Sequence, residues 1–255
     1  MFAIQHQYIE RDSGKVCTEQ LCADTAVKFL YSSARENAPV LFRAVVSAWG
    51  SSLLAYINYE TILGAKVSWG KGHLQSFNIN LDECVDGPAR LNTAKKVFER
   101  KIRFWECRPM PDDPCAIVSA SDSRVIPGSF CETSSLFLKD KFFTYDELLG
   151  CGKREWLHAF FQGNFAVFRL TPEKYHYNHT PVAGKVVDFY EIDGDYHACN
   201  PGAVVTVVTP YSKNKRFVTV IDTDVPGGPK AGLVAMIEIV ALMIGKIVQC
   251  YSEER

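Results

Sequence analysis

The chain lacks an excess of positive charge. Its 255 residues carry 28 Lys and Arg against 29 Asp and Glu, which gives a formal net charge of -1. Proteins that bind nucleic acid neutralise phosphates with basic side chains. The charge balance therefore predicts that nucleic acid is not a partner. Apolar residues make up 47% of the sequence, which is enough to build a well-packed globular core.

The chain also lacks a charge-free apolar run long enough to cross a bilayer. Residues 231–251 are nearly all apolar but include Glu238 and Lys246, and either charge is costly at the centre of a membrane. We interpret this stretch as two buried strands joined near Gly245, because it is rich in Val and Ile.

A second apolar stretch, Val40 to Ile57, is interrupted by Arg43 and is typical of a buried or interfacial helix. Residues 1–10 contain no apolar segment of the kind found in a signal peptide. These two observations predict a cytoplasmic protein and leave peripheral contact with a membrane open.

Several motifs of common sites are missing. The nine cysteines form no C-x-x-C pair, which predicts free thiols in a reducing compartment. Neither Gly50-Ser51 nor Gly128-Ser129 lies in the G-x-S-x-G pattern of a nucleophile elbow. The potential metal ligands match no zinc spacing, so we predict no metal site; these are His176, His179, His197 and Cys199.

The order of periodic segments predicts an α+β fold with a helical front and a β-rich core. We expect a hairpin over Tyr8 to Val16, a helix from Asp24 to about Arg35, and a second helix after Pro39 to about Tyr59. Asn92 or Thr93 is expected to cap a third helix, which places a domain boundary between residues 1–92 and 93–255. Later segments predict a short helix at Tyr145 to Leu149 and strands at Ala116–Ala120, Phe165–Leu170, Gly184–Tyr190, Val204–Thr209, Phe217–Asp222 and Leu233–Val248.

The most informative segment is Tyr175 to Gly184, which holds two of the six histidines, His176 and His179. Histidine is the side chain best suited to moving protons near neutral pH. Residues three apart on a straight strand face opposite sides, so the two rings would have separate roles unless the backbone bends. Two loop histidines that satisfy local carbonyls are an equally simple reading.

A candidate acid, Asp122, follows an apolar segment within a turn of small residues. An aspartate in such a turn more often caps nearby amides than takes part in chemistry. Its role therefore depends on what else lies nearby.

Taken together, the motifs resemble the phosphatidylserine decarboxylase family of pyruvoyl enzymes. The strongest match is Arg169 to Pro181, which has the form R-L-x-P-x-D-Y-H-x-x-H-x-P with Lys174 in place of the usual aspartate. Weaker matches are Phe98–Ile102, Arg108-Pro109, Val118–Ser123, Thr144–Gly150 and Asp222-Thr223. The resemblance covers residues 95–255 well and the first 60 loosely.

In this family a serine within a Gly-Ser-(Ser/Thr) motif, C-terminal to these strands, becomes a pyruvoyl group after self-cleavage. This sequence ends at Arg255 before such a motif, and Gly50-Ser51-Ser52 lies at the other end. The resemblance therefore implies that the chain is most of a β chain, whose core is completed by a separate short α chain carrying the pyruvoyl cofactor. A chain truncated short of the motif is the other reading.

The resemblance also implies roles for the site residues. His179 would take the proton of the cleavage serine and Asp122 would hold the imidazole, by the logic of a catalytic triad. The pyruvoyl ketone would form a Schiff base with the substrate amine and accept the electrons that carbon dioxide leaves. His176 would then protonate the product or position the substrate carboxylate.

The substrate stays open between a phosphatidylserine-type headgroup and a free amino acid, and a homodimer also stays open. Two other functions are compatible with the sequence. One is a catalytically inactive relative that binds a lipid or a partner. Intact mass spectrometry would then show no second chain with a blocked N-terminus. A metal-dependent hydrolase would contain stoichiometric zinc.

Overall fold

The first structured segment is a two-stranded hairpin. The structure is a computed structural model that describes residues 7–19, 21, 24–60, 79–131, 135–138, 141–200, 203 and 210–250. Strands β1 (Gln7–Ile9) and β2 (Val16–Thr18) pair antiparallel. Gly14 closes the turn at a φ of 66°, in the left-handed region that glycine enters without strain. The predicted hairpin is therefore confirmed.

The hairpin is tied to a distant pair of strands by one acidic side chain. The Glu19 carboxylate is buried and forms ion pairs with Arg124 and Arg169. These two arginines are direct partners across strands β3 (Arg124–Ser129) and β6 (Asn164–Arg169). Burial alone would raise the pKa of Glu19, but the two guanidinium groups outweigh it and lower that pKa.

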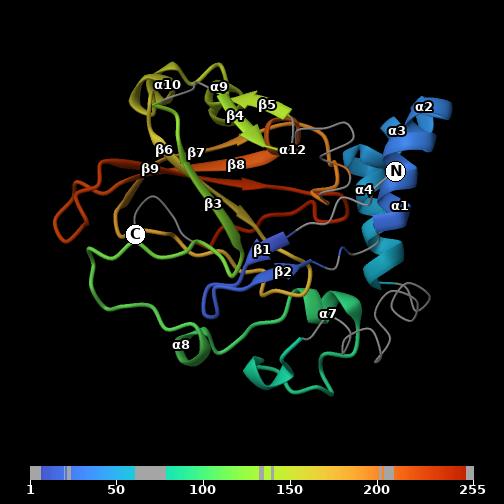
Figure 1. The fold of residues 1–255 in the computed structure, drawn as a ribbon, viewed down its shortest axis with the longest axis horizontal. Helices are drawn as coiled ribbons and strands as arrows, with labels where there is room; N and C mark the ends of the chain where they lie inside the picture. The colour runs from blue at the N-terminus through green and yellow to red at the C-terminus, as the bar shows by residue number, and fades with distance from the viewer. Residues whose placement is uncertain are drawn as a thin grey trace.

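Two helical stretches follow the hairpin. The first runs without a break through α1 (Asp24–Phe29), η1 (Leu30–Ala34) and α2 (Arg35–Asn37), which agrees with the helix predicted from Asp24. The second consists of α3 (Pro39–Val46), α4 (Ala48–Ala55) and η2 (Tyr56–Glu60). Figure 1 shows these elements together at one end of the molecule.

The second helical stretch is bent where the sequence predicted one continuous helix. Ser47 is extended, with a ψ of 163°, and its side chain accepts a hydrogen bond from the Gly50 amide, so it begins a new helix. In the part of the chain that the structure describes, no single helix is long and apolar enough to span a membrane. The pair 39–46 and 48–60 meets that criterion only together, with a bend of 71° between them.

The apolar stretch Val40 to Ile57 is only partly buried. Phe42 and Val46 lie in the core, whereas the outer face exposes Val40 at 79% and Trp49 at 73% of their surface. An exposed tryptophan beside exposed aliphatic side chains is typical of an interfacial surface. The buried alternative therefore holds only for the inner face, and the interfacial alternative stays a prediction.

A third helix begins where predicted but is short. The Thr93 hydroxyl accepts a hydrogen bond from the Lys96 amide and caps α7 (Ala94–Phe98). The chain then passes through an isolated bridge at Ile102 and forms α8 (Phe104–Cys107). A 3₁₀ turn, η3 (Leu81–Glu83), precedes these helices and pairs with the segment between them.

The centre of the molecule is a three-stranded antiparallel sheet. Its order is β7 (Lys185–Ile192), β8 (Arg216–Asp222) and β9 (Leu233–Ile239). The middle strand β8 is buried on both faces, with Val218, Thr219 and Val220 fully inaccessible. A smaller hairpin joins β4 (Ser135–Leu138) to β5 (Lys141–Thr144). Figure 1 shows the long sheet crossing the molecule.

Short helices cover one side of this sheet. Thr144 and Glu147 form a capping box that begins α9 (Tyr145–Leu149), as predicted. Helix α10 (Arg154–Ala159) follows, and α12 (Pro210–Lys213) leads into β8. Leu149 packs against Val218 and Val220, so burial of these side chains attaches α9 to the sheet.

Two predicted strands are wrong. Residues 116–120 form no strand. Two backbone hydrogen bonds join them to the histidine segment, from the Val118 amide to the Pro181 carbonyl and from the His179 amide to the Ala120 carbonyl, and Pro181 has no N–H to return the first of them. The apolar stretch after β9 turns at 241–244, where Met243 has a φ of 66°, and 245–250 form no second strand. The predicted strand at 204–209 lies outside the described residues.

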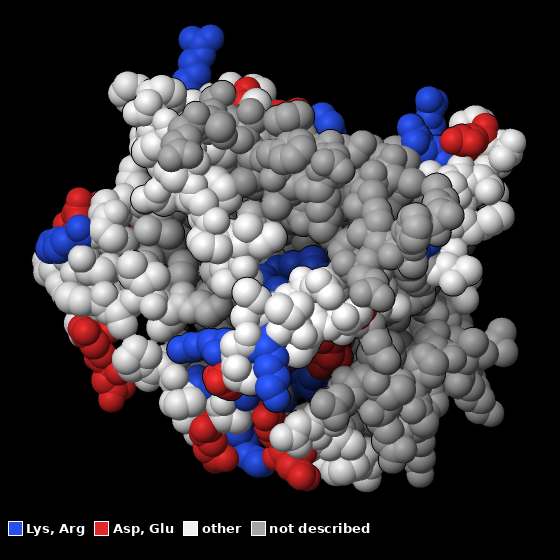
Figure 2. All heavy atoms as spheres, in the orientation of Figure 1, with Lys and Arg blue, Asp and Glu red and all other residues white. Residues whose placement is uncertain are grey.

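Helices and sheets together confirm a mixed α+β class. The helical front shares a core with later segments, because Tyr31, Phe42 and Val46 pack with Ala198 and Ala203. A domain boundary between residues 92 and 93 stays a prediction. Figure 2 shows basic and acidic side chains interspersed on one face, around a hollow near its middle.

Candidate functional site

The histidine segment follows strand β6 and runs in an irregular conformation towards β7. It begins with a buried Thr171, whose carbonyl accepts the Lys174 amide at 3.0 Å, and continues with a buried Tyr175. No helix or strand contains His176 or His179. Both histidines therefore lie in a loop that leads into a strand.

The segment that carries Asp122 lies directly beside the second histidine. The His179 amide donates to the Ala120 carbonyl at 2.8 Å, and the Val118 amide donates to the Pro181 carbonyl at 2.9 Å. Asp122 follows Ala120 by two residues. The backbone therefore brings together two motifs that are separated by more than fifty residues of sequence.

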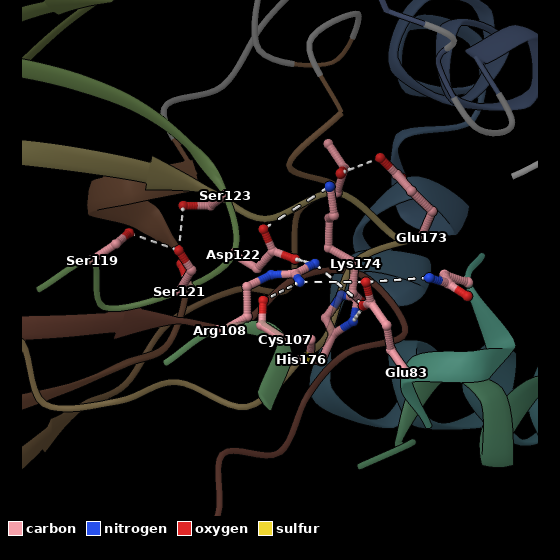
Figure 3. A network of polar contacts seen from close by, with 12 residues as sticks. Glu83, Cys107, Arg108, Ser119, Ser121, Asp122, Ser123, Glu173, Lys174 and His176 are labelled. Carbon is pink, nitrogen blue, oxygen red and sulfur yellow. Dashed lines mark hydrogen bonds and ion pairs between the residues drawn. The ribbon is translucent and has the colours of Figure 1, made fainter. Parts of the chain in front are cut away.

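The Asp122 carboxylate has two cationic neighbours. Arg108 Nη2 donates to Oδ2 at 3.1 Å, and Lys174 Nζ lies 4.0 Å from Oδ1. Arg108 also contacts Glu83 Oε2 at 3.3 Å, so one guanidinium links two carboxylates, as Figure 3 shows. Burial alone would lower the pKa of Arg108, but Asp122 and Glu83 outweigh it and raise that pKa.

His176 is held as a neutral ring. Its Nδ1 lies 2.8 Å from the Lys174 carbonyl, so Nδ1 carries the proton and Nε2 carries the lone pair. Its ring packs on Phe98 of α7 at 3.8 Å between centroids. Burial, followed by the positive charge of Arg100, lowers the pKa of His176 to about 4.

His179 lies in a different aromatic environment. The Tyr175 hydroxyl is 3.4 Å from its Nε2, and its ring packs on Phe104 of α8 at 5.1 Å between centroids. Burial lowers the pKa of His179, which favours a neutral imidazole able to accept a proton. The two histidines therefore pack on different helices, in keeping with separate roles.

The expected contact between Asp122 and His179 is not among the interactions of the described residues. Arg108 and Lys174 occupy the carboxylate instead. The orienting role of Asp122 stays a prediction.

Sequence reasoning assigned no role to three residues that complete this network. Arg100 is buried, donates to the carbonyls of Val97 and Glu173, and leaves its Nε without a hydrogen-bond partner in the described part of the chain. Arg108 and Glu83 form the link to Asp122. The Phe98–Ile102 and Arg108-Pro109 matches were usable signals for Arg100 and Arg108, whereas Glu83 stands in no recognisable pattern.

The other residues considered as metal ligands or as a nucleophile lie elsewhere. His197 is bound by Tyr31 and Asp195, and Ser51 is buried in α4, where its hydroxyl accepts from the Met243 amide. Burial raises the pKa of the Cys199 thiol to about 12. In the described ranges, no three His, Cys, Asp or Glu side chains converge to hold a metal ion, and the eight described cysteines are free thiols.

Comparison with known proteins places this network in a family. Residues 94–255 match the profile of the family described as phosphatidylserine decarboxylase. A phosphatidylserine decarboxylase proenzyme of Fusobacterium nucleatum is 28% identical over 251 residues, which cover 96% of this chain and 78% of that protein. Proenzyme 3 of Schizosaccharomyces pombe is 30% identical over 95% of this chain and 25% of its own length.

A third relative, the proenzyme of Brevibacillus brevis, is 31% identical over 66% of this chain and 58% of its own length. The chain thus spans only part of each relative. The profile match contains both histidines, Asp122 and most of their neighbours. The chain belongs to the phosphatidylserine decarboxylase family, a family of lyases made as proenzymes.

Proposed function

We propose that this protein is a pyruvoyl-dependent decarboxylase that acts on the serine headgroup of phosphatidylserine after self-cleavage of a proenzyme. The observation that carries the proposal is the pair of backbone hydrogen bonds joining residues 118–120 to 179–181. They bring the segment that carries Asp122 beside His179 of the family's most specific motif. The names of the relatives supply the substrate.

In self-processing, His179 is the base. A serine hydroxyl is a weak nucleophile and needs a neighbouring group to take its proton. His179 is suited to this because burial favours its neutral form. Asp122 would orient the imidazole once its carboxylate turns from Lys174, which is 4.0 Å away and the weaker of its two cationic contacts.

In decarboxylation, a pyruvoyl group held at this site would supply the electron sink for the bond that breaks as carbon dioxide leaves. The residues present fit such a group. The buried Nε–H of Arg100 lacks an acceptor among the described residues and belongs to a guanidinium that acts on His176. A carbonyl or carboxylate oxygen placed there would satisfy it.

His176 is our candidate for the proton donor to the product carbon. In the structure its Nε2 carries a lone pair, so His176 must first gain a proton. The carboxylate of an arriving substrate favours this gain, because a nearby negative charge raises the pKa of an imidazole. Binding and protonation are thereby coupled at one ring.

We also propose peripheral contact with a membrane through the outer face of α3 and α4. Val40, Leu41 and Trp49 are among the most exposed large apolar side chains described. Burying them in a lipid interface is favourable, and Trp is enriched there. A lipid substrate would then be within the same interface.

The test is release of carbon dioxide from phosphatidylserine in mixed micelles, compared with free amino acids, by the full-length proenzyme. Intact mass should show a second chain with a blocked N-terminus. His176→Ala should still mature but lose about a hundredfold or more in turnover, as expected when a positioned acid is removed. His158→Ala, an exposed histidine of α10, is the matched control. An uncleaved single chain with full activity would refute the proposal.

A further inference from the structure

A cavity lies apart from the candidate site, between the helical front and the segment at 195–197. Its volume is about 330 Å³, and its walls include Arg35, Phe42, Arg43, Asp195 and His197. None of Asp122, His176 and His179 lines it. The volume is at the small end of the range for ligand pockets, which suits a headgroup-sized molecule.

One wall of the cavity is held rigid. His197 is 7% exposed and uses both ring nitrogens: Nδ1 lies 3.3 Å from the Tyr31 hydroxyl and Nε2 lies 3.4 Å from Asp195 Oδ2. Phe42 stacks on the same ring at 6.1 Å between centroids. The Asn214 side chain bonds both the amide and the carbonyl of His197, which fixes its backbone as well.

The charges around the cavity are two cations and one anion. Arg35 and Arg43 are exposed, and neither has a carboxylate partner among the residues that the structure describes. Arg35 lines the cavity together with His197, whose pKa is lowered by burial and, to a smaller extent, by the positive charge of Arg35. The Asp195 side chain is 59% exposed, so its second oxygen is accessible to a ligand.

This arrangement favours a ligand that carries both a negatively and a positively charged group. Guanidinium groups match the geometry of phosphate oxygens and bind them with charge-assisted hydrogen bonds. A carboxylate beside an aromatic ring binds a primary ammonium group by charge and by cation–π attraction. Inorganic phosphate alone would be repelled by Asp195, and a simple amine would be repelled by the two arginines.

We propose that this cavity binds the headgroup of an aminophospholipid, with the phosphate on Arg35 and Arg43 and the ammonium on Asp195. The neighbouring surface indicates that the headgroup belongs to a lipid and not to a soluble molecule. Pro39 lines the cavity, and the next two residues of α3, Val40 and Leu41, are exposed at 79% and 59%. Acyl chains could cover these side chains while the headgroup enters the cavity. The inference does not depend on decarboxylation at His176 and His179.

The first test uses soluble phosphoethanolamine, titrated into the protein by calorimetry. We expect saturable binding that weakens about tenfold or more in Arg35→Gln and in Arg43→Gln, as for loss of one charge-assisted contact. Arg90→Gln removes an arginine that is 83% exposed and is the matched control. Asp195→Asn should abolish the preference for phosphoethanolamine over inorganic phosphate. Binding that is unchanged in the Arg35→Gln and Arg43→Gln double variant would overturn the site.

The second test decides the source of the headgroup. Co-sedimentation should show stronger binding to phosphatidylcholine vesicles that contain phosphatidylethanolamine than to phosphatidylcholine alone. Arg43→Gln should remove this difference while leaving self-processing intact, which separates this site from the proposed catalytic one. Soluble binding with no dependence of vesicle binding on the headgroup would overturn the lipid assignment. Thermal melting of each variant excludes unfolding as the cause.

Discussion

Replacing His176 with Gln should flatten the pH dependence of stability between pH 4 and pH 6.5. Burial lowers the pKa of His176 from 6.5 to about 4 in the folded protein. Within this window the unfolded chain binds the proton and the folded chain does not. The free energy of unfolding therefore falls as the pH falls through the window.

The size of the effect follows from the two pKa values. Relative to pH 7, His176 should cost the folded state about 2 kcal/mol near pH 5 and about 3 kcal/mol near pH 4. A glutamine cannot gain this proton, so the variant should lose that share of the pH dependence. His179 and His197 also have pKa values lowered first by burial, so part of the dependence should remain.

Urea unfolding at pH 7, 5.5 and 4.5 measures the effect. Whatever their difference at pH 7, the wild type should lose about 2 kcal/mol more than His176→Gln between pH 7 and pH 4.5. His158→Gln removes an exposed histidine of α10 and serves as the control. Parallel curves for the wild type and His176→Gln would show that the ring is not held neutral by burial against Phe98, and our account of its protonation would fail.

Three further predictions concern processing, the core and the membrane surface. His179→Ala and Asp122→Asn should each leave an uncleaved precursor on a denaturing gel, because base and orienter act as one unit; normal cleavage of either variant contradicts the assignment. Asn214 is fully buried and makes three hydrogen bonds to backbone groups, so Asn214→Ala should cost about 3–5 kcal/mol in urea unfolding. Trp49→Ser should weaken vesicle binding about tenfold without lowering stability, whereas Trp105→Ser, an exposed tryptophan of α8, should not.

Local signals predicted local structure well. The hairpin over Tyr8 to Val16, the cap at Thr93 and the short helix at Tyr145 to Leu149 each depend on interactions within a few residues, and each is present. The bend at Ser47 was missed because a serine inside an apolar helix gives no sign of whether it caps a new helix or points to solvent.

Non-local pairing was harder to predict. The segment expected as a strand at 116–120 is joined to the histidine segment by two backbone hydrogen bonds, at His179 and Pro181, and no pattern within the segment itself reveals that partner. The histidine motif led to the candidate site, and family resemblance gave Asp122 its predicted role. The ion pair between Arg108 and Glu83 depends on tertiary proximity alone, so sequence periodicity could not have found it.

The ion pairs of Glu19 make the pairing of two distant strands conditional on the N-terminal hairpin. Arg124 and Arg169 face each other directly across β3 and β6, and like charges in that position repel. Glu19 is the counterion that turns this repulsion into attraction. An N-terminal truncation past residue 19 would therefore act at long range, by exposing two unneutralised arginines at the strand end from which the histidine segment departs.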